Sequence, residues 1–84
     1  MIDQNLRAIE AEEVTTGVAP TKRGSADGFY VGGDGDVEVV TGNGTTVLFS
    51  GLIAGQIVPI NIRLIDSGNT TATNLVYLFS YLNN

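Results

Sequence analysis

Three carboxylates lie close together at Asp34, Asp36 and Glu38, and their spacing invites comparison with a metal site. Hard cations such as Ca²⁺ bind several oxygen ligands, which a turn with this spacing could supply. The twelve-residue frame of an EF-hand loop is absent, however, and only Asp36 and Glu38 share a face once the strand begins. The sequence therefore favours a solvated turn and strand rim, and it predicts no metal site.

Catalytic chemistry has few side chains to use. The sequence contains neither His nor Cys. The commonest general base and transition-metal ligand is therefore missing, and neither a disulfide nor a thiolate metal site is possible. Lys22 is its only lysine, and nothing near it resembles a Ser-Lys arrangement. The glycines of Gly42-Asn43-Gly44 precede a strand and not a helix, which excludes the phosphate-binding mechanism of glycine-rich loops. We predict no catalytic residue, no cofactor and no enzyme activity.

The charge of the chain limits its partners. The net charge is −5, from nine acidic and four basic residues, and nucleic-acid surfaces need clustered Lys and Arg. No apolar run approaches the roughly 20 residues of a membrane span, and the acidic residues near the N-terminus are unlike a signal peptide. We therefore expect no nucleic-acid or membrane partner and synthesis in a cytoplasm.

The elements that would hold these side chains are short strands. The chain divides near Asp27 into an N-terminal arm, residues 1–26, and a β-sandwich domain, residues 27–84. Frequent Gly, Asn and Asp between β-branched and aromatic residues predict a small antiparallel β-sandwich or barrel of about six to eight strands. Within the arm, residues 6–14 fit either a helical turn or a strand, and we favour an extended arm or edge strand.

The clearest local signal is a hairpin at Asn43-Gly44, because both residues tolerate positive φ and match the strand twist. Strands are expected at 36–40 and 45–50, with Val37, Val39, Val47 and Phe49 in the core. Further strands are expected at 28–32, at 56–66 as the longest, and at 74–82. In the turn at 51–55, Leu52 or Ile53 should tuck under the sheet, and Pro59 should mark an edge or a bulge.

The last strand is apolar on both faces. One face carries Leu75, Tyr77, Phe79 and Tyr81, and the other carries Val76, Leu78, Ser80 and Leu82. A strand in a small sandwich usually shows water one polar face, so we expect a second copy to cover one of them, with Leu75, Tyr77, Phe79 and Tyr81 as the oligomer interface. The alternative cover is the N-terminal arm of the same chain. In the arm, Leu6 and Ile9 are the expected contacts with a neighbour.

The order of motifs from Gly28 to Phe79 resembles a family of small tailed-phage virion proteins, which includes the spike base proteins of gene transfer agents. The shared features are an aromatic-Val-Gly strand, a Gly-Asp-Val turn and strand, a Thr-Val-Thr-Phe-like strand, a small-residue turn that leads into a Pro-interrupted strand, and a Thr-rich loop before a final hydrophobic strand. Here they are Phe29-Tyr30-Val31-Gly32, Gly35-Asp36-Val37, Thr46 to Gly51, Ala54 to Ile60, and Asn69-Thr70-Thr71-Ala72-Thr73.

The resemblance implies synthesis in the cytoplasm of a bacterial host and a capsid-surface role in a virion, as a spike base or as a decoration protein. Such a protein would form a homo-oligomer, a trimer or pentamer, and bind the major capsid protein or a spike or fibre protein. The alternative is a small carbohydrate- or protein-binding β-sandwich module. Modules of that kind usually present exposed aromatic residues, often Trp, and this chain has no Trp.

Overall fold

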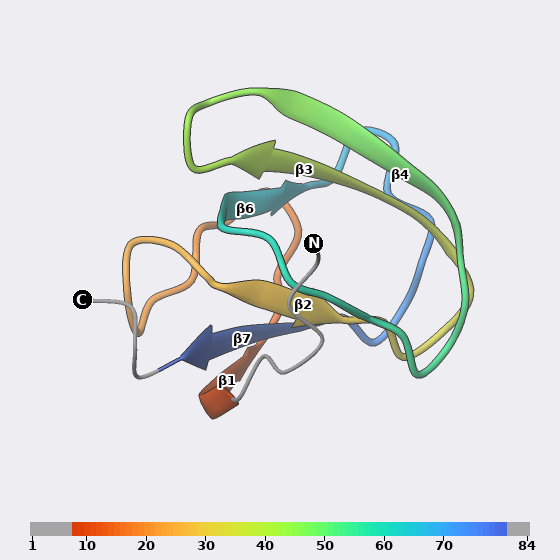
Figure 1. The fold of residues 1–84 in the computed structure, drawn as a ribbon. Helices are drawn as coiled ribbons and strands as arrows, with labels where there is room; N and C mark the ends of the chain where they lie inside the picture. Colours follow the sequence, from red (N-terminus) through yellow and green to blue (C-terminus); the bar gives the residue numbers. More distant parts are fainter. Residues whose placement is uncertain (1–7, 81–84) are drawn as a thin grey trace.

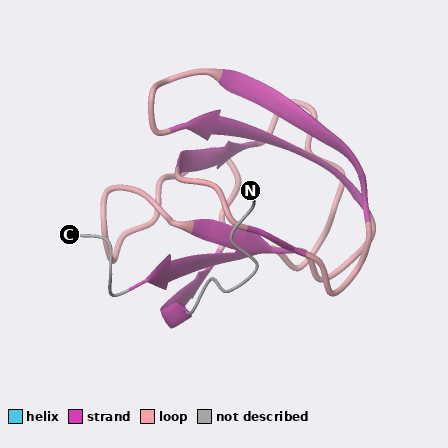
Figure 2. Ribbon diagram, in the orientation of Figure 1, coloured by secondary structure: helices cyan, strands magenta, loops and turns pink. Residues whose placement is uncertain are grey.

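The computed structural model describes residues 8–80, which form two antiparallel sheets and contain no helix (Figures 1 and 2). This confirms the predicted all-β sandwich. The strands of the described range are β1 (Ala8–Glu13), β2 (Gly28–Tyr30), β3 (Gly35–Thr41), β4 (Thr46–Leu52), β5 (Ile57–Val58), β6 (Ile62–Asp66) and β7 (Val76–Ser80).

The four-stranded sheet has the order β1-β7-β2-β5, and the three-stranded sheet has the order β4-β3-β6. Two contacts show how the sheets face each other. The ring of Phe29 in β2 meets that of Phe49 in β4 edge-to-face, with centroids 6.1 Å apart. The Tyr77 hydroxyl of β7 accepts a hydrogen bond from the Ile65 N–H of β6 at 2.9 Å. The β5 edge therefore lies on the β4 side of the sandwich, and the β1 edge lies on the β6 side.

The core lies between the sheets and follows the strand alternation. Val37 and Val39 of β3 are fully buried, while the residues between and beside them are half-buried on the outer face. Val47 and Phe49 pack against this core from β4, so the predicted inward faces of both hairpin strands are confirmed. The buried apolar residues are Ala26, Phe29, Val31, Val37, Val39, Leu52, Ile62, Ile65, Ala72, Leu75, Tyr77 and Phe79.

The predicted Asn43-Gly44 hairpin is present. The Thr41 N–H donates to the Thr45 carbonyl at 2.8 Å across the turn, and Gly44 has a φ of 89°, which only glycine adopts without strain. The return strand β4 continues to Leu52, two residues beyond the prediction. Leu52 is 8% exposed and Ile53 is 64% exposed, so Leu52 is the residue that tucks under the sheet.

The prediction of one long strand at 56–66 is wrong. The segment contains two strands that belong to different sheets, and residues 59–61 carry the chain across. Pro59 has no N–H for a ladder, and the Ile60 N–H donates to the nearby Val58 carbonyl at 3.1 Å. A register shift opposite Val40 and Thr41 then places an extra residue, Arg63, in β6. Strict alternation does not hold in β6, because Ile62 and Ile65 are both fully buried.

The segment after β1 closes the side of the sandwich where β6 has its free edge. The Gly17 N–H donates to the Ile65 carbonyl at 2.7 Å. The Tyr77 hydroxyl accepts from the Ile65 N–H and donates to the Val18 carbonyl at 3.0 Å. Residues 8–26 thus supply an edge strand, a cover for β6 and the buried Ala26 to the same fold.

Replacing Tyr77 with Phe should lower the free energy of unfolding by about 1–3 kcal/mol, because the buried Ile65 N–H loses its acceptor. The variant should also lack the fall in stability that the Tyr77 hydroxyl causes at alkaline pH. Burial raises the pKa of Tyr77 above its usual value of 10.0, so the unfolded chain releases the phenol proton first. The contribution of Tyr77 to stability is then complete at pH values below the pKa of Tyr77 in the unfolded chain. It falls as the pH rises through the pKa of Tyr77 in the folded chain. Urea unfolding of both proteins between pH 8 and 11 checks this, and parallel pH profiles would contradict it.

Candidate interaction surface

The three clustered carboxylates hold loops together. Asp34 accepts a hydrogen bond from the Ala54 N–H at 2.7 Å, and Asp36 accepts one from the Gly51 N–H at 2.9 Å. Glu38 accepts from the Asn69 side-chain amide at 3.1 Å. In residues 8–80 no group of three or more acidic, His or Cys side chains could hold a metal ion. The observed chemistry of these carboxylates is therefore structural.

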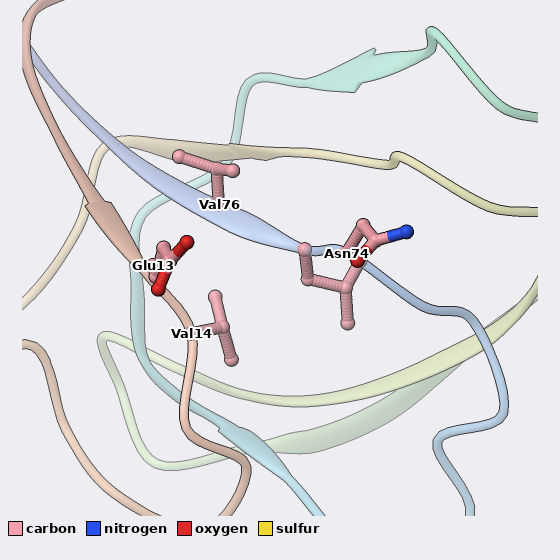
Figure 3. Close-up of a pocket in the computed structure, with 5 residues that line it drawn as sticks. Glu13, Val14, Asn74 and Val76 are labelled. Carbon is pink, nitrogen blue, oxygen red and sulfur yellow. The ribbon is translucent and has the colours of Figure 1, made fainter.

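A hollow of about 280 Å³ lies where β1 ends and β7 begins (Figure 3). Glu13, Val14, Asn74, Leu75 and Val76 line it, and the Val14 N–H donates to the Leu75 carbonyl at 3.1 Å beside it. Glu13 is the only titratable side chain of this lining. An acid and a base cannot be paired here, so the hollow lacks the side chains that a hydrolytic active site needs.

The described part of the predicted interface lies inside the molecule. Leu75, Tyr77 and Phe79 are 6%, 1% and 0% exposed, and they belong to the buried core of their own chain. Tyr81 and Leu6 lie outside the described residues. Ile9 is 58% exposed in β1 and is available to a neighbour. The side of β7 that is left for another chain is therefore the one that carries Val76 and Leu78.

Those two side chains belong to a larger surface, which we call the outer apolar face. Val76 lies opposite Tyr30, and Tyr30 lies opposite Ile57, so one apolar row crosses β7, β2 and β5. Leu78 lies beside it, opposite Ala11 of β1. The outer apolar face comprises Ala11, Tyr30, Ile57, Val76 and Leu78. Tyr30 is 36% exposed and Ile57 is 49% exposed.

An acidic residue borders this face at β1. Glu13 lies opposite Val76 at the edge of the sheet.

Glu12, on the other face, accepts hydrogen bonds from the Thr21 N–H and hydroxyl and from the Lys22 N–H, all between 2.9 and 3.0 Å. These bonds, those from Thr21 first, lower the pKa of Glu12. Glu12 therefore holds the 21–22 loop as a carboxylate and is poorly suited to act as a base near neutral pH.

The surface offers little to a carbohydrate. Tyr30 is the most exposed aromatic side chain in residues 8–80, and Tyr77 is buried. Sugar-binding platforms stack several aromatic rings against the ligand, and one ring does not make such a platform. The outer apolar face therefore suits contact with another protein better than binding of a carbohydrate.

Comparisons with known proteins agree with the fold. No family model and no curated protein sequence matches the chain. A solved structure, the capsid of a native GTA particle computed with C5 symmetry, contains a chain with a similar fold, at a TM-score of 0.72 and 21% sequence identity. The match covers 93% of this chain and 90% of that chain. Among residues 8–80 there is no helix long and apolar enough to cross a bilayer. The chain thus shares its fold, over nearly its whole length, with a chain in the capsid of a GTA particle.

Proposed function

We propose that this protein is a non-enzymatic structural component of a phage-like particle, where it serves at the capsid surface as a spike base or a decoration protein. The observation that carries the proposal is the fold match to a GTA capsid chain, because it spans nearly the whole of both chains. A partial match would be compatible with a shared sandwich inside proteins of unrelated roles.

The character of the surface supports a role in assembly. The outer apolar face crosses four neighbouring strands and contains exposed Tyr and Ile side chains, which are typical anchors of protein interfaces. In this proposal the outer apolar face meets another chain of the particle, the major capsid protein or a spike or fibre protein. The exposed Ile9 extends the contact along β1. The protein also associates with copies of itself.

The proposal predicts that Ile57→Asp lowers the amount of this protein in particles by roughly tenfold, because a charge is placed in an apolar contact. Ile57 is 49% exposed in the free chain, so folding should be retained. The measurement is quantitative immunoblotting of particles from the bacterium that carries the gene, purified on a density gradient. Circular dichroism of the purified variant checks its fold.

Thr45→Asp is the matched control, because Thr45 is exposed in the hairpin turn, outside the four-stranded sheet. It should enter particles at the wild-type level. The assignment to a particle fails if the wild-type protein is abundant in the cells but absent from purified particles. Equal incorporation of Ile57→Asp and wild type would exclude the outer apolar face as the contact.

A further inference from the structure

Sheet edges carry unpaired backbone groups, and three of the four edges of this sandwich are protected in familiar ways. The β1 edge carries Glu10, Glu12 and Glu13 and has an irregular register near Ala8. The β5 edge is only two residues long. The β6 edge is covered by the segment after β1, through the hydrogen bonds of Gly17 and Tyr77. Each device discourages pairing with a further strand.

The fourth edge, β4, is the least protected. Its seven residues, Thr46–Leu52, contain no charge and no proline, and within residues 8–80 β3 is its only partner strand (Figure 1). Its register against β3 shifts between Phe49 and Leu52 and is regular from Thr46 to Phe49. Leu48 is 44% exposed on the outer face. Val47 and Phe49 are half-buried and pack against the core from this edge. An added strand would cover the part of these two side chains that remains in water.

We propose that the β4 edge pairs with the β4 edge of a second copy of this chain, antiparallel and centred on Leu48. The sequence Thr46-Val47-Leu48-Phe49-Ser50 is self-complementary about that residue. In this register each Thr46 faces Ser50 of the other copy, each Val47 faces Phe49, and the two Leu48 side chains meet. Hydroxyl pairs and pairs of a β-branched with an aromatic residue are among the stabilising cross-strand combinations.

Charge favours β4 over β1 as the edge through which two copies pair. Each chain has a net charge of −5, so two copies repel at most orientations. Pairing through β1 would bring the three glutamates of each copy together, whereas pairing through β4 brings together no charged residue of either strand. The two three-stranded sheets would join into one sheet across a twofold axis. Such a contact closes at two copies, and it leaves the outer apolar face free.

This inference rests on the proposed function only for its biological setting, because it specifies one self-contact of the proposed particle protein. It is tested by charge exchange at Leu48. Leu48→Lys and Leu48→Glu each place like charges opposite each other across the twofold axis, so dimerisation in sedimentation-equilibrium runs should weaken by roughly tenfold or more. An equimolar mixture of the two variants should restore dimers, because opposite charges then meet.

A covalent trap gives a second measurement. The chain has no cysteine, so Leu48→Cys is the only thiol in that variant, and mild oxidation should convert most of it to a disulfide-linked dimer at low protein concentration. Ala11→Cys, exposed on β1, should cross-link much more slowly. Ile57→Asp should leave the β4 dimer intact, which separates this contact from the outer apolar face.

Three outcomes would overturn the proposal. They are a wild-type protein that remains monomeric at millimolar concentration, Leu48 charge variants that dimerise as wild type does, and a mixture of the two variants that stays monomeric. If wild type is monomeric but Leu48→Lys fails to enter particles, the β4 edge binds a strand of a different particle protein and not a second copy. If the β4 dimer forms but the protein is absent from particles, the inference stands and the proposed function fails.

Discussion

Tyr77→Asp should leave the purified chain largely unfolded at room temperature. The side chain of Tyr77 is 1% exposed, so the substitution buries an unpaired carboxylate, leaves a cavity and removes both hydrogen bonds of the hydroxyl. We expect a loss of about 5 kcal/mol or more. A domain of this size has about 4–12 kcal/mol of stability in total. The loss of the β-sheet signal in circular dichroism and of chemical-shift dispersion would report the unfolding.

Tyr30→Asp is the matched control. Tyr30 lies in β2, the strand next to β7, and is 36% exposed on the outer apolar face. Its substitution should change the free energy of unfolding by much less and leave the chain folded. A Tyr77→Asp protein that is folded but no longer self-associates would contradict the placement of Tyr77 in the core. It would restore Tyr77 as an interface residue.

Gly35→Ala should destabilise the protein by about 3 kcal/mol or more. A Cβ at this position would lie 2.5 Å from the Ala72 nitrogen and 2.7 Å from its Cα, and both are backbone atoms that no side-chain rotation can move. The φ of 153° is itself rarely adopted by other residues. The first residues of β3 would have to separate from the 71–72 loop, which donates two hydrogen bonds to the Asp36 carbonyl.

The control for this substitution is Gly24→Ala. A Cβ on Gly24 has no atom within 4 Å, and its φ is not in the left-handed region, so the change should be neutral or slightly stabilising. Urea unfolding midpoints compare the two variants, and hydrogen exchange at Thr71 and Ala72 locates the effect of Gly35→Ala. Equal midpoints for Gly35→Ala and wild type would mean that the 71–72 loop can move aside without cost.

Local patterns predicted what is local in this fold. The hairpin at Asn43-Gly44 and the inward faces of β3 and β4 follow from turn chemistry and strict alternation, and both depend on residues close in sequence. Local pattern does not decide whether Leu52 or Ile53 is the buried residue. The end of β4 is set by the Asp36 carboxylate, which lies in another strand and accepts a hydrogen bond from the Gly51 N–H. The sequence predicts that the carboxylate cluster lies at a turn and strand rim, as it does. The hydrogen bonds that these carboxylates accept come from loops 15 to 31 residues away, which a local pattern cannot indicate.

The errors arise where distant segments decide the structure. The apolar alternation of 56–66 continues through Pro59, so the sequence indicates an edge or a bulge at Pro59 but not that the chain changes sheets there. For β7 the sequence correctly indicates two apolar faces. It does not indicate that β6 lies over Tyr77, or that Tyr30 and Ile57 continue the opposite face. These are consequences of strand order, which periodicity within one segment cannot encode.

The pairing of β1 with β7 has a consequence for how the chain folds as it is made. Ala8 lies opposite Ser80, so the four-stranded sheet cannot be completed until residue 80 has left the ribosome. The β3–β4 hairpin spans residues 35–52 and can form earlier, since its contacts are local. Until the four-stranded sheet is complete, one apolar side of the hairpin is therefore uncovered.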